Sequence, residues 1–141
     1  MRSHPDPLLL RRALLGNAAF SALTGLTLLA AAGPLEAVLG VPEVALRVVG
    51  LLLLPFAAGL LRLATRERVD RGQAWLAVAM DLAWVAGSAV LLLGELWPLN
   101  TAGTWTVIGV ADVVLTFALL QTLGLWRGAS ASAPAAPPDA A

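Results

Sequence analysis

Two acidic residues, Asp81 and Asp112, stand inside long apolar stretches of the chain. An ionisable side chain costs about 2.5–3.5 kcal/mol at the centre of a membrane helix on insertion scales, so such residues are candidates for function. Burial disfavours the charged form of a carboxylic acid, which makes a buried carboxyl group suited to binding a proton or a cation. We therefore expect any chemistry of this protein to centre on these two carboxyl groups.

Asp81 shares one helical face with Trp84 and Ser88, because positions i, i+3 and i+7 return to the same side of a helix. Asn17 stands at a similar depth in another apolar stretch. These four residues are the predicted ligand-binding or proton-binding site, a polar seam between two helices. The structural alternative is that Asp81 only ties helices together, by a hydrogen bond to Asn17 or an ion pair with Arg62.

Asp112 and Thr116 share a face of a different helix and form a second predicted polar site. Arg47 is the expected partner of Asp112, in a structural ion pair. Gln121 lies about 180° around the helix from Asp112, so it is expected to bond a neighbouring helix instead.

Several classes of chemistry are excluded by composition. The chain has no cysteine and one histidine, His4, so thiol chemistry and a zinc or bis-histidine haem site are not expected. No Gly-rich phosphate loop, metal-ligand helix or catalytic triad is found, and we expect no cofactor, no metal and no enzyme activity. Nine arginines balance nine acidic residues to a net charge of zero. The chain therefore lacks the excess of positive charge that nucleic-acid binding requires.

The elements that carry these residues are predicted to span a membrane. Of the 141 residues, 59% are hydrophobic and 13% charged, against about 25% charged in soluble domains. A spanning helix needs about 20 apolar residues. Four stretches qualify, at about 13–32, 44–63, 74–93 and 105–125. They predict an all-α membrane protein, a bundle of four transmembrane helices over residues 1–127, followed by a disordered tail at 128–141. Residues 35–39 are expected to form a short interfacial turn.

The arginines indicate an orientation. Eight of them flank one side of the predicted spans, and Arg47 alone lies on the other. Positive residues favour the cytoplasmic side, so we expect a multi-pass protein of the inner (plasma) membrane with both termini cytoplasmic. A secretory signal at the amino terminus is the alternative, but the apolar stretch of about 20 residues exceeds the usual 7–15.

The first and third predicted spans are similar to each other. With a shift of 64 residues (81 − 17), residues 17–24 align with 81–88, and the alignment pairs Asn17 with Asp81, Phe20 with Trp84, and Thr24 with Ser88. This pattern favours two duplicated helical hairpins related by an axis along the membrane normal. Chance similarity between helices rich in alanine and leucine is the alternative. Phe20 and Trp84 are expected to form an aromatic layer beside the seam.

The phrases LLGNAAFSALTGLTLLA, LRVVGLLLLPFAAGLL and DLAWVAGSAVLLL resemble a group of small, uncharacterised four-helix bacterial integral membrane proteins, over about residues 8–127. In architecture the chain is also similar to the DoxX-like four-helix proteins. The resemblance implies a fold and a membrane location, and it supplies no active site.

We expect a non-enzymatic integral membrane protein that binds a small amphiphile or a partner membrane protein in the polar seam. The alternative is a proton-coupled transporter or exporter of small solutes that acts as a homo-oligomer, with Pro55 serving the motion of its helix. A membrane-bound redox subunit that binds quinone is a third class, based on the architectural analogy alone.

Overall fold

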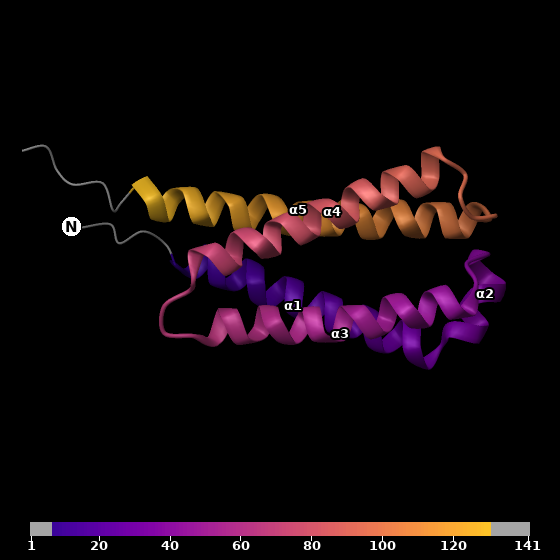
Figure 1. Cartoon of the computed structure of the whole chain (residues 1–141), viewed down its shortest axis with the longest axis horizontal. Coiled ribbons are helices and arrows are strands. Elements are labelled where there is room, and N and C mark those ends of the chain that lie inside the picture. The colour runs from indigo at the N-terminus through magenta and orange to yellow at the C-terminus, as the bar shows by residue number, and fades with distance from the viewer. Residues whose placement is uncertain (1–6, 131–141) are drawn as a thin grey trace, which may run out of the picture.

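The computed structural model describes residues 7–130, which form five helices and no strands (Figure 1). In chain order the helices are α1 (Pro7–Ala30), α2 (Ala32–Leu39), α3 (Glu43–Thr65), α4 (Arg71–Leu93) and α5 (Thr101–Ser130). The all-α prediction is confirmed.

Four of the helices, α1, α3, α4 and α5, are long and apolar enough to cross a membrane, as predicted. Large apolar side chains cover their outer surfaces, and Leu93 and Val44 are 87% and 73% exposed. A soluble protein rarely presents so much contiguous apolar surface to its solvent, whereas hydrocarbon accommodates it without cost. The molecule is therefore a multi-pass membrane protein whose outer surface contacts lipid.

Two predicted helix boundaries differ from the structure. Helix α1 begins at Pro7 and not near residue 13, because its first turns carry arginines that an apolar criterion passes over. Proline suits a helix start because it lacks only an N–H group that would be unpaired there. Helix α5 extends to Ser130, so the tail predicted at 128–141 begins inside a helix, and its remainder lies outside the described residues.

The segment between α1 and α3 is a short helix and not the expected turn. Helix α1 ends at Ala30, and α2 includes Gly33 and Pro34 in its first turn, where proline is tolerated. Gly40 ends α2 in the left-handed conformation, with φ 73°. A Cβ atom on Gly40 would also lie 2.8 Å from the Pro98 carbonyl oxygen, so both the backbone and the packing require glycine.

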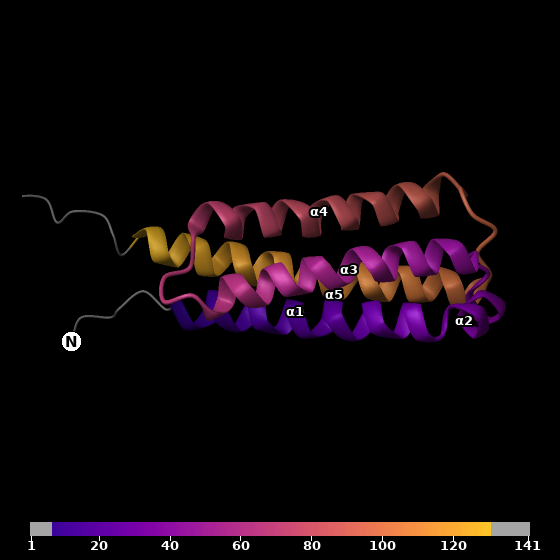
Figure 2. The same cartoon turned by 60° about the horizontal axis from the view of Figure 1, so that its bottom comes forward.

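The long helices do not pack equally on one another (Figures 1 and 2). Helix α1 packs against both α3 and α5, and α4 packs against α5, while α3 and α4 touch at few points. Gly25 and Gly50 bring α1 and α3 close, because a Cβ atom on Gly50 would lie 2.8 Å from the Gly25 carbonyl oxygen. The bundle is thus an open arrangement in the order α3–α1–α5–α4.

Arginines tie the helices together at one end of the bundle. The Arg11 guanidinium donates hydrogen bonds to the carbonyl oxygens of Ala64, at 2.7 Å, and Glu67, at 3.3 Å. Arg71 donates to the carbonyl oxygen of Leu125 at 3.0 Å. The Ala64 and Glu67 carbonyl groups lie at and just beyond the carboxyl end of α3, where acceptors are unpaired and cations are attracted, whereas Leu125 lies inside α5. We refer to this end as the arginine-rich end.

Candidate functional site

Asp81 is the meeting point of three helices. Its Oδ2 atom accepts a hydrogen bond from Asn17 Nδ2 of α1 at 2.7 Å and another from Gln121 Nε2 of α5 at 3.0 Å. All three side chains are buried. Each lies about ten residues from the arginine-rich end of its helix, or roughly 15 Å deep at 1.5 Å per residue. The sequence therefore places a carboxyl group and two amides at one depth inside the bundle.

The amide of Asn17 is oriented by its own helix. Ser21 lies one turn further along α1 and donates from Oγ to Asn17 Oδ1 at 3.2 Å. Because the amide oxygen is engaged on that side, the NH₂ group is directed to Asp81. The small, buried Ser21 and Asn17 thus present a donor to the carboxylate at a fixed position.

Three polar atoms at this site have no hydrogen-bond partner among the described residues. Asp81 Oδ1 accepts no bond, since both amides bind Oδ2. The indole Nε1 of Trp84 and the amide Oε1 of Gln121 are buried and equally unpartnered. A buried polar group without a partner costs about 1–3 kcal/mol, so such atoms are uncommon in folded proteins. Two of the three belong to residues that line a cavity.

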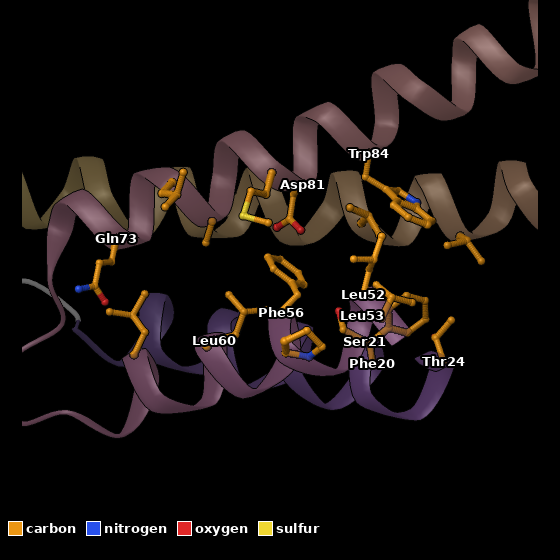
Figure 3. Close-up of a pocket in the computed structure, with 18 residues that line it drawn as sticks. Phe20, Ser21, Thr24, Leu52, Leu53, Phe56, Leu60, Gln73, Asp81 and Trp84 are labelled. Atoms are coloured by element: carbon orange, nitrogen blue, oxygen red, sulfur yellow. The ribbon is translucent and has the colours of Figure 1, made fainter. Parts of the chain in front are cut away.

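The cavity has a volume of about 690 Å³ and lies where α3 and α4 fail to pack on each other. Figure 3 shows Asp81 projecting from α4 toward Phe56 of α3, across the cavity, and Trp84 further along α4, toward Leu52. Most of its lining is apolar. The principal lining residues are Phe20, Leu52, Phe56, Leu60, Met80 and Val114, with Gln73 near the arginine-rich end.

A second cavity of about 640 Å³ lies beyond Trp84, toward α2. Trp84, Thr24 and Val110 line both cavities, so the indole stands between them. Ser88 and Trp97 line only the second. The two cavities together follow the bundle from near its arginine-rich end to the α2 end.

The predicted seam residues do not all take the expected places. The expected contact between Asn17 and Asp81 is present. Ser88 is buried, but its hydroxyl donates to the Trp84 carbonyl oxygen of its own helix at 2.9 Å and joins neither Asp81 nor Asn17. Arg62 is exposed and forms no ion pair within residues 7–130, so the expected alternative partner of Asp81 is wrong.

The expected aromatic layer of Phe20 and Trp84 is also different in the structure. The Phe20 ring contacts Phe117 of α5, with ring centroids 6.1 Å apart and planes at 48°. Phe20 and Trp84 both line the first cavity instead of stacking on each other. The two aromatic residues therefore border the same cavity.

Gln121 is a candidate site residue that the sequence analysis did not include in the site. It was expected only to form a hydrogen bond to a neighbouring helix. In the structure it binds the same carboxylate oxygen as Asn17. The depth of Gln121 in the membrane could have predicted this contact. Asp81 lies about ten residues after the start of α4, and Gln121 lies about as far before the end of α5, so both are equally far from the arginine-rich end.

At the second predicted polar site, Asp112 does not have the expected partner within residues 7–130. Arg47 pairs with Glu43, one turn earlier on α3, and not with Asp112. Asp112 is exposed on α5, and Thr116 donates to its backbone carbonyl oxygen at 3.0 Å, leaving the carboxyl group untouched. The expected ion pair is wrong because residues four apart on one helix are closer than residues on α3 and α5.

Across residues 7–130 no group of three or more histidine, cysteine, aspartate or glutamate side chains could hold a metal ion. No family model, no curated protein and no solved structure matches the chain. The resemblance expected from the sequence is therefore limited to architecture, namely four long apolar helices in a small membrane protein.

Proposed function

We propose that the protein binds a small amphiphile in the cavity between α3 and α4, with the polar head at Asp81 and Trp84. The observation that carries the proposal is the pair of unpartnered atoms on one face of α4. Asp81 Oδ1 is an acceptor, and Trp84 Nε1 is a donor three residues later. A head group that both donates and accepts, such as a hydroxyl or a primary amide, has the kind of partner that each atom lacks.

The cavity suits the apolar part of such a molecule. Ligand sites in proteins are typically about 300–1,000 Å³, mostly apolar, with a few placed polar groups, and a cavity of about 690 Å³ falls in that range. Phe56, Leu60 and Met80 supply apolar surface for a hydrocarbon chain. The apolar contacts provide affinity, and the two polar atoms select the head group.

Access from the bilayer follows from the packing. Since α3 and α4 touch at few points, the cavity lies along a side of the bundle that no other described helix closes. An amphiphile dissolved in the bilayer already has its chain in hydrocarbon. It enters sideways without passing through water.

The proposal is tested by binding of 12-bromododecan-1-ol to the protein in lipid nanodiscs, followed by bromine quenching of tryptophan fluorescence. In Asp81→Asn the amide oxygen accepts the two bonds now made to Oδ2, and an NH₂ donor replaces the acceptor Oδ1. Trp84→Phe removes the indole donor. Each variant is expected to weaken binding about tenfold, the equivalent of one hydrogen bond to a polar or charged group. In the Trp84→Phe protein the other four tryptophans report the binding.

Ser88→Ala is the matched control, because the Ser88 hydroxyl is already bonded within its own helix and does not line the first cavity. It is expected to bind the alcohol as the unaltered protein does. Equal affinity in all four proteins would exclude Asp81 and Trp84 as the head-group site. Capture of a membrane protein in place of the alcohol would favour the alternative of a partner helix in the seam.

One observation favours the alternative function, proton-coupled transport. The two cavities share Trp84 and together run along the bundle, as a solute path requires. In that case Asp81 exchanges its proton for the solute, and adding the solute to unbuffered protein releases protons. Proton release that disappears in Asp81→Asn would support transport, and its absence over a panel of lipophilic amines would count against it.

We further propose that the bundle lies in a bacterial inner membrane, with the arginine-rich end at the cytoplasmic surface. Arg11, Arg62 and Arg71 lie at that end, and Arg47 is near the other. The positive-inside rule supports this orientation. The α1–α3 and α4–α5 hairpins are proposed to derive from one duplicated unit, in which Asn17 and Asp81 are equivalent positions.

A further inference from the structure

Asp112 is an ionisable residue in an unusual place. It lies near the middle of the membrane-spanning part of α5, on the exposed surface, and it lines neither cavity. Its carboxyl group makes no hydrogen bond or ion pair with any described residue. The other ionisable side chains of the four described spans are either at helix ends, like Arg47, or buried, like Asp81.

Such an arrangement is costly in an isolated molecule. Acidic residues within membrane spans almost always face the interior of a bundle or a water-filled cavity, because hydrocarbon offers no hydrogen-bond partners. In this chain α5 turns Asp112 away from both. We therefore expect another protein surface to pack over Asp112 and to supply polar contacts to its carboxyl group.

The surrounding residues form a stripe along α5 that we call the α5 outer face. Its members are exposed and recur at alternating intervals of four and three residues, the spacing of a helix–helix seam: Trp105, Gly109, Asp112, Thr116, Leu119 and Leu123. A Cβ atom added to Gly109 would meet nothing within 4 Å, so another backbone has room to approach there. Polar groups sit at its centre and apolar ones toward its ends.

We propose that a second copy of this chain packs its α5 outer face against this one, across a two-fold axis along the membrane normal. Two copies share one topology, so their α5 helices run parallel and bring Gly109, Asp112 and Thr116 to equal depths. Within one chain the Thr116 hydroxyl donates to the Asp112 backbone carbonyl oxygen. In the dimer it turns and donates instead to the Asp112 carboxyl group of the other copy, one turn away along the seam, while that carbonyl oxygen keeps its helical N–H bond.

The second copy is favoured over another partner because the face is self-complementary. It carries an acceptor, a donor and a glycine at the point of closest approach within two helical turns. A two-fold contact uses the same patch on both molecules, so that one patch must carry both a donor and an acceptor. The dimer leaves the cavity between α3 and α4 open, since neither Asp112 nor Thr116 lines it.

The test uses the absence of cysteine from the chain. Gly109→Cys introduces a single thiol on the α5 outer face, and oxidation with copper phenanthroline in native membranes traps a contact between copies. We expect most of the protein to migrate as a disulfide-linked dimer. Gly87→Cys is the matched control on α4, because a Cβ atom there also meets nothing within 4 Å. It is expected to remain monomeric.

A second measurement tests the role of the carboxyl group. Förster transfer between differently labelled copies in lipid vesicles, diluted stepwise with lipid, gives the dimer affinity. Asp112→Ala is expected to weaken the dimer about tenfold, because two symmetry-related contacts are lost. Asp112→Asn keeps an acceptor and is expected to stay within about threefold of the unaltered protein.

The proposal is overturned if Gly109→Cys gives no more dimer than Gly87→Cys, or if Asp112→Ala associates as tightly as the unaltered chain. Crosslinking of Gly109→Cys to a different protein would also overturn it, in favour of a foreign partner on the same face.

Discussion

Asn17 Nδ2 and Asp81 Oδ2, on residues 64 positions apart, lie 2.7 Å from each other and join the two hairpins of the bundle. The two oxygen atoms of the Asp81 carboxyl group differ in their contacts. Oδ2 accepts hydrogen bonds from α1 and α5, while Oδ1 has no partner in the described chain. The structural and the functional interpretations of Asp81 are therefore compatible. One oxygen ties the helices together, and the other is proposed to bind the ligand.

Asn17→Ala is expected to destabilise the protein by about 1–3 kcal/mol. It removes a buried donor from Asp81 and also the acceptor of the Ser21 hydroxyl. The free energy of unfolding in detergent, measured with increasing denaturant, checks the prediction. A change below about 0.5 kcal/mol would show that the amide does not support the carboxylate.

Gln121→Leu is expected to cost less than Asn17→Ala. The substitution removes one donor to Asp81, but it also removes the unpartnered Oε1 atom of Gln121, so part of the loss is offset. The same unfolding measurement compares the two variants. A larger loss for Gln121→Leu would mean that Gln121 Oε1 has a partner when the protein is in the membrane.

The fold was largely predictable because hydropathy is a property of each helix alone. The long apolar stretches gave the four spans, and the shared depth of Asn17 and Asp81 anticipated their contact. The pairing of Asp112 with Arg47 failed because depth does not determine how helices are rotated about their axes. Glu43 and Arg47, four residues apart, carried a readable signal for the pair that forms instead.

Gly50→Ala is expected to separate α1 from α3. Its Cβ atom would lie 2.8 Å from the Gly25 carbonyl oxygen, and a backbone atom cannot move aside alone. Gly59→Ala on the same helix is the control, since its Cβ atom meets nothing within 4 Å. Alanine favours a helix over glycine by about 1 kcal/mol, so the control is expected to be neutral or more stable. Thermal unfolding of both variants checks the prediction. Equal changes in their unfolding temperatures would refute it.

Arg11→Met is expected to destabilise the arginine-rich end by about 1.5–3 kcal/mol, because the guanidinium bonds two carbonyl oxygens, one in the last turn of α3 and one just beyond it. Arg12→Met changes the net charge equally, but the Arg12 side chain is exposed. Unfolding measurements on the two variants separate packing from charge. Equal losses would mean that charge alone matters.

Single cysteines report the proposed orientation. Arg68→Cys lies in the exposed loop between α3 and α4, and Leu96→Cys is exposed between α4 and α5. With the arginine-rich end in the cytoplasm, an impermeant maleimide labels Leu96→Cys in spheroplasts and labels Arg68→Cys only after lysis. The opposite pattern would reverse the orientation.

The central claim is that Trp84 and Asp81 bind a polar head group together. Its most direct test is the indole N–H resonance of Trp84, assigned with Trp84→Phe, during titration with dodecan-1-ol and with dodecane. We predict a downfield shift with the alcohol only, and a smaller shift in Asp81→Asn, because the N–H gains an acceptor that Asp81 helps to hold. A resonance that stays in place with the alcohol, or moves equally with dodecane, would contradict the account.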